Sequence, residues 1–148
     1  MMKSRTLFFI AIGLLILGIA LFTFSRSHQE STQVFPATVV RDCAPWDGAA
    51  FTVSVQYDAS ATIYISIWQS PDFNFPATFS FPDETGQIGI VYILPELGPY
   101  TELRGEVSLE SVGEGMPLEG RFNFTSERGG QFKGQFKAEW RNEIVYCG

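Results

Sequence analysis

Most of the chain beyond residue 33 alternates between apolar and polar residues with a period of two. The segments 51–57, 118–125 and 131–140 all follow this pattern. Residues 62–68 alternate as well, but Tyr64 and Trp68 lie opposite the three isoleucines, and apolar groups on both faces predict a central strand or a surface that contacts another molecule. Successive side chains of a strand point to opposite faces, so the alternation predicts strands with one buried face. In the last segment the predicted buried side holds Phe132, Gly134, Phe136, Ala138 and Trp140.

Two further segments depart from this simple pattern. Residues 87–94 are apolar in both phases, with Ile88, Ile90, Tyr92 and Leu94 against Val91 and Ile93. Apolar groups on both sides predict a central strand that is buried on both faces. Residues 73–81 carry Phe73, Phe75, Ala77, Phe79 and Phe81 in one phase but are interrupted by prolines. Because proline cannot donate to a sheet ladder, we expect this segment at an edge or in an irregular conformation.

The pattern as a whole predicts an all-β domain of about eight strands. No stretch after Phe24 has convincing helical periodicity, and the connections are short, which favours pairing between sequential antiparallel strands. The expected fold is a single antiparallel meander that forms either an up-and-down barrel or a β-sandwich. Gly120 and Gly134 lie in the inward phase, where we expect them to leave room for aromatic rings such as Phe122, Phe132 and Trp140.

The first part of the chain has a different character, because residues 7–24 are apolar and contain no charge. Eighteen residues of helix span about 27 Å, close to the hydrocarbon thickness of a bilayer. Lys3 and Arg5 precede this segment, which predicts a cytoplasmic N-terminus. We therefore expect a cytoplasmic flank at 1–6, a transmembrane signal-anchor at 7–24, a polar stalk at 25–33 and an extracytoplasmic domain at 34–148. A cleaved signal peptide, giving a secreted protein, is the alternative.

The two cysteines lie near the ends of the predicted domain, at Cys43 and Cys147. In an oxidising compartment such a pair predicts a disulfide. Free thiols or a metal pair are the alternative, but no further cysteine or histidine lies near them in the sequence to complete a zinc site.

Charge is distributed unevenly along the chain. All 16 acidic residues follow the apolar segment, together with 8 of the 10 basic ones, and no lysine or arginine occurs between Asp42 and Leu103. A protein with this balance repels phosphate backbones, so we expect no nucleic-acid partner. The acidic half is expected to form solvated turns and strand ends, or else to meet a cation or a basic partner.

The residues of most catalytic and cofactor sites are missing from the predicted domain. His28, the only histidine, lies in the stalk, which excludes serine–histidine and cysteine–histidine nucleophilic sites from the domain. No phosphate-binding glycine loop is present. Asp42 and Asp47 lack the spacing of a calcium loop, and Asp83-Glu84 is typical of a turn. We expect no metal, no cofactor and no enzyme, with a carboxylate-based hydrolase as the least favoured alternative.

Aromatic residues in the acidic half are the best candidates for a site. Trp46, Tyr64, Trp68, Tyr92 and Tyr100 all fall in this region. On an outer face, Tyr64 and Trp68 would form a surface for a protein or a glycan; on the inner face they would belong to the core.

Two functions therefore compete within the predicted fold. The first is a membrane-anchored binding module that docks a protein or glycan through Trp46, Tyr64, Trp68 and Tyr92. The second is a small β-barrel that holds an apolar ligand in a phenylalanine-rich interior.

Overall fold

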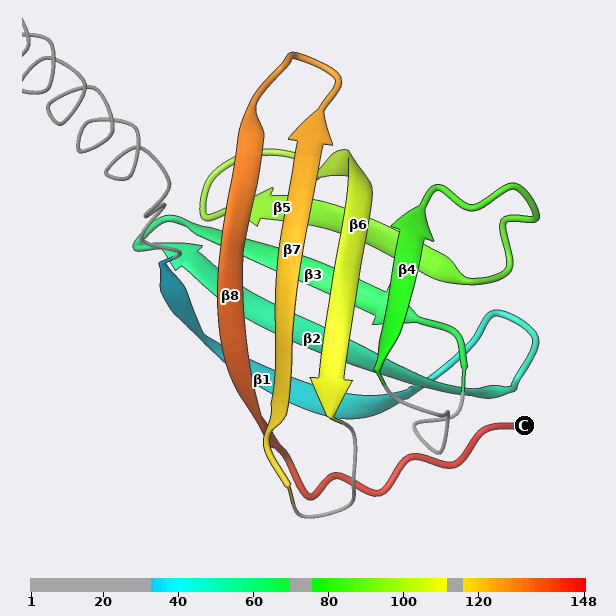
Figure 1. Ribbon diagram of the computed structural model, residues 1–148. Coiled ribbons are helices and arrows are strands. Elements are labelled where there is room, and N and C mark those ends of the chain that lie inside the picture. Colours follow the sequence, from blue (N-terminus) through cyan, green and yellow to red (C-terminus); the bar gives the residue numbers. More distant parts are fainter. Residues whose placement is uncertain (1–32, 70–75, 112–115) are drawn as a thin grey trace, which may run out of the picture. The chain divides into compact units, whose positions relative to one another are not determined.

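The computed structural model describes residues 33–69, 76–111 and 116–148 (Figure 1). The predicted membrane segment at 7–24 and most of the predicted stalk lie outside these residues. Within the part of the chain that is described, no helix has the length and apolar character needed to cross a membrane. The described residues form strands and their connections, which confirms the all-β prediction.

The described residues form eight strands, in agreement with the predicted number. They are β1 (Val34–Cys43), β2 (Ala49–Asp58), β3 (Ala61–Ile67), β4 (Ala77–Phe81), β5 (Gly89–Pro95), β6 (Thr101–Ser111), β7 (Leu118–Ser126) and β8 (Gln131–Trp140). The first of them was not identified from the sequence. Phe35, Ala37 and Val39 share one phase there, but Val34 and Val40 make the other phase apolar as well. Pro36 obscured that pattern, and it lies on the exposed phase of β1.

Seven of these strands close into a barrel, which decides between the two predicted architectures. Neighbouring strands follow the order β6-β5-β3-β2-β1-β8-β7, and β7 pairs again with β6 to complete the ring. In Figure 1, β6, β7 and β8 cross one side of the barrel and β1, β2, β3 and β5 run behind them at an angle. The eighth strand, β4, is added along β6.

The barrel closes through a parallel pair, whereas the sequence predicted a wholly antiparallel meander. Val34–Val39 of β1 pairs with residues 135–140 of β8 in the same direction. The correction has a simple geometric reason. In a ring of strands that alternate in direction, an odd number of strands leaves the first and the last running the same way. All other pairs are antiparallel, as predicted.

Strand β6 has three neighbours, and this is where the chain leaves a sequential meander. One edge of β6 pairs with β5 at Thr101 and Glu102 and then with β4 from Gly105 to Leu109. Gly105 has a φ of 139°, and a Cβ added there would lie 2.1 Å from the carbonyl oxygen of Asn123. A side chain is therefore excluded at the point where β6 changes partners. The proline-flanked segment that contains β4 lies outside the ring, consistent with the predicted edge position.

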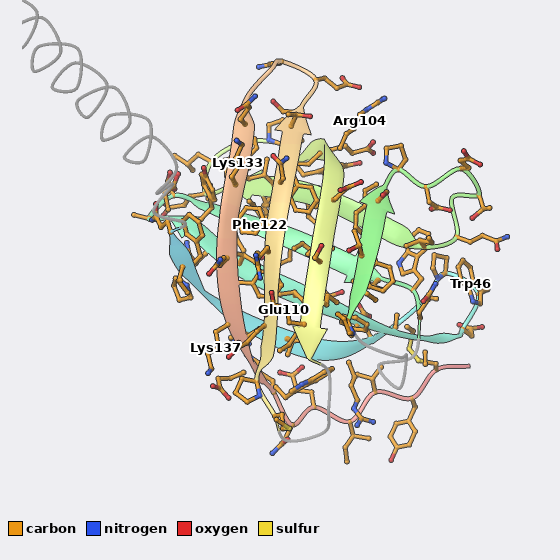
Figure 2. The ribbon with its side chains drawn as sticks, in the orientation of Figure 1. Trp46, Arg104, Glu110, Phe122, Lys133 and Lys137 are labelled. Atoms are coloured by element: carbon orange, nitrogen blue, oxygen red, sulfur yellow. A yellow bond between two sulfur atoms is a disulfide. The ribbon has the colours of Figure 1, made fainter. Side chains whose placement is uncertain are left out.

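Aromatic and branched side chains fill the barrel interior. Phe122 is 4% exposed and contacts the rings of Phe35, Tyr57, Phe124 and Phe136, with centroid separations of 5.6–6.4 Å (Figure 2). Every second side chain of β2 and β3 points into this interior, and most of them are fully buried, among them Val53, Val55, Ile63, Ile65 and Ile67. The predicted inward phases of β2, β7 and β8 are thus confirmed. For β3 the sequence left the inward face open, and the structure buries its isoleucines while Tyr64 lies in the outward phase.

The two inward glycines do make room for rings, although the rings are not those expected. A Cβ at Gly134 would lie 2.3 Å from the ring of Phe35, and one at Gly120 would lie 2.6 Å from the ring of Phe136. Phe35 comes from β1, the strand that the sequence pattern did not reveal. The parallel β1–β8 pair brings it over Gly134.

Gly134→Ala is expected to destabilise the domain by about 1–3 kcal/mol, because overpacking forces neighbouring side chains from their positions. The Phe35 ring cannot easily yield, since it stacks on Tyr57 at 4.9 Å and contacts Phe122. Urea unfolding measures the effect. Gln135→Ala on the same strand is the control and should change stability by less than about 0.5 kcal/mol. Equal stability of the Gly134 variant and the wild type would show that the ring is not confined.

The strand that was predicted to be buried on both faces, β5, is buried on only one. Val91 is 2% exposed and points inward, but Ile90 and Leu94 lie on the outside and are 45% and 39% exposed. The prediction was wrong because it assumed a second packed layer. A barrel is a single sheet closed on itself, so one face of every strand points outward unless another element covers it.

The C-terminal segment returns to the end of β1. The Arg141 amide donates a hydrogen bond to the carbonyl of Val39 at 2.9 Å, and a disulfide joins Cys43 to Cys147, with their Cα atoms 5.6 Å apart. This confirms the predicted disulfide. Figure 1 shows this segment passing below the barrel toward the connection between β1 and β2.

Candidate functional site

The outer side of β5 exposes an unbroken row of apolar side chains. Ile90, Tyr92 and Leu94 alternate with the inward Val91 and Ile93 and therefore share the outer face. The exposed apolar surface continues beyond the strand, because Leu97 is 91% exposed and Tyr100 is 60% exposed. Such a row is unusual on a soluble domain, where contiguous exposed apolar patches mark interaction sites.

Tyrosines from neighbouring strands extend this surface sideways. Tyr64 of β3 lies directly opposite Tyr92 of β5, and their rings stack with centroids 5.1 Å apart and planes 15° apart. The ring of Tyr100 then meets Tyr92 edge-on at 5.6 Å. We call the surface formed by Tyr64, Ile90, Tyr92, Leu94 and Tyr100 the β5 face.

The two tryptophans predicted for the same site form a separate pair. Trp68 directly follows β3, and Trp46 lies in the connection between β1 and β2 (Figure 2). Their rings meet edge to face, with centroids 5.6 Å apart and planes 85° apart. Trp46 is 52% exposed, so part of this pair is accessible. All four predicted residues therefore lie on the outside of the barrel as two contacting pairs, one containing Tyr64 of β3 and the other Trp68, just beyond the end of β3.

A chain of polar side chains crosses the outer surface beside the tyrosines. The Thr52 hydroxyl hydrogen-bonds to the Asp42 carboxylate at 2.9 Å and to the Ser66 hydroxyl, also at 2.9 Å. Asp42 also accepts a hydrogen bond from the Cys43 amide at 2.8 Å, which orients its carboxylate. Ser66 lies opposite Ile90, so this row of hydrogen-bonded side chains reaches the margin of the β5 face.

Burial and two neighbouring residues affect the pKa of Tyr92. Partial burial, together with the negative charges that a Tyr64 phenolate and Asp42 place nearby, raises the pKa of Tyr92 above its ordinary value of 10.0. The neutral phenol is thus the form that the folded protein favours. The pKa of Tyr92 is therefore higher in the folded protein than in the unfolded chain. The free energy of unfolding falls as the pH rises from the unfolded-state pKa through the folded-state pKa.

A pH titration of tyrosine ring carbons by NMR is expected to give Tyr92 a midpoint above 10.0, and Asp42→Asn should lower that midpoint. Asp58→Asn is the matched control, because Asp58 ends β2, where its carboxylate accepts a hydrogen bond from the Ser60 amide. It should leave the Tyr92 midpoint unchanged. A Tyr92 midpoint at its ordinary value, or a midpoint that Asp42→Asn leaves unchanged, would contradict the described arrangement.

The opposite side of the barrel is charged and internally paired. Lys137 contacts Glu119 at 2.9 Å, Arg104 contacts Glu127 at 3.6 Å, and Arg121 pairs with Glu110. A shallow hollow of about 260 Å³ lies among these strands, lined by Val34, Glu110, Glu119, Arg121, Gln135 and Lys137. Its oppositely charged side chains neutralise one another, which leaves it with little selectivity for a charged ligand.

Asp83 has the role in a turn that its sequence context predicted. Its carboxylate accepts hydrogen bonds from the amides of Thr85 and Ile88 at 3.0 and 3.1 Å, and from the Thr85 hydroxyl. These bonds, with the hydroxyl first in effect, lower the pKa of Asp83 to about 2. A carboxyl held in its ionised form in this way is a poor general acid. Among the residues that the structure describes, no three metal-ligating side chains gather into a site.

Sequence reasoning identified the aromatic residues of the surface but missed its aliphatic ones. Ile90 and Leu94 were assigned to a buried strand. The sequence did contain an indication of this surface, because residues 87–94 are apolar in both phases. In a barrel strand one of those phases points outward, where a partner molecule can cover it. Comparison with known proteins adds no further identification: no family model, curated protein or solved structure matches this chain.

Proposed function

We propose that this protein is a membrane-anchored, extracytoplasmic binding module that docks a partner protein through the β5 face. In this proposal residues 7–24 form the anchor, and the barrel lies on the far side of the membrane from Lys3 and Arg5. The Cys43–Cys147 disulfide is consistent with an oxidising compartment.

One observation carries the docking function, namely the exposed apolar row of β5. Ile90 and Leu94 are 45% and 39% exposed on either side of the stacked Tyr92. The centres of protein interfaces are apolar, enriched in aromatic residues and depleted of most charged ones. The β5 face has that composition, and no charged residue interrupts β5 itself.

The stacking of Tyr64 on Tyr92 favours a protein over a glycan at this position. A sugar ring stacks on an exposed aromatic face, but these two rings, 15° from parallel, turn their faces toward each other. Their edges and hydroxyl groups are then left for the partner, which suits hydrogen bonding to a polypeptide.

An apolar ligand inside the barrel, the other function considered, has less support. Rings from several strands already contact one another across the interior, from Phe35–Tyr57 to Phe81–Phe124. Even eight strands enclose an interior that side chains can fill, and this ring has seven. A ligand there would have to displace packed aromatic groups.

Photo-cross-linking in intact cells tests the docking function. A photoreactive residue at Ile90 or Leu94 of the full chain is expected to give one adduct that Tyr92→Ser abolishes. The same residue at Glu119 or Gln135, on the opposite side of the barrel, is the matched control and should give none. If residues 7–24 are an anchor, the adduct stays with the membrane after alkaline extraction. Equal yields from both sides, or none from β5, would refute the proposal.

A further inference from the structure

We propose that the partner docked on the β5 face presents a basic, amphipathic segment, in which lysine or arginine side chains flank apolar ones. This inference rests on the docking function proposed above and goes on to name the chemistry of the partner. It is argued from the carboxylates that border the face, from the position of the chain's own basic groups and from the exposed aromatic edge.

Carboxylates border the β5 face on two sides. Glu102 of β6 lies directly opposite Tyr92 in the sheet and therefore shares the outer surface with it. On the β2 side, the Asp42 carboxylate is held by Thr52, which in turn bonds to Ser66 next to Ile90. The apolar row thus lies between a negative charge on β6 and another at the end of β1.

The chain's own basic residues are directed elsewhere. No lysine or arginine occurs between Asp42 and Leu103, a stretch that includes β2, β3, β4 and β5. Arg104 shares the outward phase of Glu102, but its guanidinium contacts Glu127 in the β7–β8 connection. Arg41 is in the opposite phase of β1, paired with the inward Phe51. Figure 2 shows Lys133 and Lys137 along β8, whereas Arg104 lies on β6, the strand that also carries Glu102.

A basic amphipathic segment satisfies both parts of this surface. Its apolar side chains would cover Ile90 and Leu94, while a guanidinium or ammonium would meet Glu102 and lie against Tyr100, which is 60% exposed. Cations are attracted to carboxylates and to the faces of aromatic rings. The same negative field disfavours anionic lipids and nucleic acids as occupants of the face.

Three fluorescent peptides of equal length test the inference with the full chain in uncharged detergent. Each capped octapeptide alternates leucine with arginine, glutamine or glutamate, and binding is followed by anisotropy, with detergent alone as a blank. The arginine peptide is expected to bind at least about tenfold more tightly than the glutamine peptide at low salt. That advantage should shrink at 0.5 M salt, where the Debye length falls to a few ångströms.

Matched variants locate the binding site. Glu102→Gln is expected to weaken the arginine peptide about two- to fivefold, the usual range for an exposed ion pair. Glu119→Gln removes a carboxylate from the opposite side of the barrel and should have no effect. The double variant Ile90→Ser/Leu94→Ser should weaken the arginine and glutamine peptides alike, because it removes the shared apolar contact.

The outcomes separate this inference from the docking function on which it rests. If all three peptides bind equally and the Ile90→Ser/Leu94→Ser variant loses all of them, the face docks proteins but the basic partner is refuted. If the arginine peptide binds and that variant is unaffected, the β5 face is not the docking site. A hexasaccharide of N-acetylglucosamine that binds instead and is lost with the same variant would replace the protein partner with a glycan. Failure of the arginine peptide to bind overturns the basic partner, while the cross-linking result still decides the docking function.

Discussion

Phe124→Ala is expected to lower the free energy of unfolding by about 3–5 kcal/mol, the usual cost of removing a buried phenylalanine ring. Phe124 is fully buried, stacks on Phe122 at 5.6 Å and meets Phe81 of β4 edge-on at 6.4 Å. The substitution therefore removes contacts on the ring and also the packing that holds β4 against it. Urea unfolding followed by circular dichroism measures the loss.

Tyr100→Ala is the matched control for this substitution. Tyr100 is also aromatic, but it is 60% exposed, and its ring contacts Tyr92 on the outer surface. Its removal should change stability by less than about 1 kcal/mol, because it buries little area in the folded state. If the two substitutions had equal effects, Phe124 would not belong to the core, and the inward phase assigned to β7 would be wrong.

Removing the disulfide with Cys43→Ser/Cys147→Ser is expected to cost about 2–5 kcal/mol. The bond joins residues separated by 104 positions, so it limits the unfolded chain severely. It also ties the segment after β8 to the end of β1, close to the parallel β1–β8 pair that closes the barrel. The free energy of unfolding of the oxidised wild type and of the variant gives the difference directly.

Two comparisons show whether this effect comes from the cross-link itself. Wild-type protein that is fully reduced should unfold at the same urea concentration as the double variant. Glu143→Ala, in the segment between β8 and Cys147, should leave the midpoint unchanged, because Glu143 is exposed and its side chain is not needed for closure. A double variant as stable as the oxidised wild type would mean that the strands alone determine the stability of the closed barrel.

Local periodicity correctly predicted which side chains of β2, β7 and β8 point inward. The valines of β2 and the phenylalanines of β7 occur at every second position, and all of them are buried. This succeeds because alternation is a property of the extended backbone and needs no knowledge of the neighbouring strands. The room that Gly134 provides could be predicted for the same reason, but the ring that fills it could not, because Phe35 comes from a strand about 100 positions away.

Alternation could not predict how strands that are distant in the sequence pair with one another. The parallel β1–β8 pair, and the position of β4 beside β6, depend on how many strands the ring holds and on the change of pairing partner along β6 near Gly105. Neither feature leaves a local periodic signal. The cysteine positions did suggest that the two ends of the domain meet, and this was the only long-range information that the sequence offered.

Some features of the candidate site could likewise be predicted from the sequence, and others only from the structure. The sequence by itself identified the aromatic residues, the absence of basic residues between Asp42 and Leu103 and the pairing of Cys43 with Cys147. Only the tertiary structure decided that Ile90, Tyr92 and Leu94 lie on the outside, that Tyr64 stacks on Tyr92, and that Glu102 borders them. The physical reason is that alternation distinguishes the two faces of a strand but not which face is covered. That depends on closure of the sheet, which buries one face of β5 and leaves the other exposed.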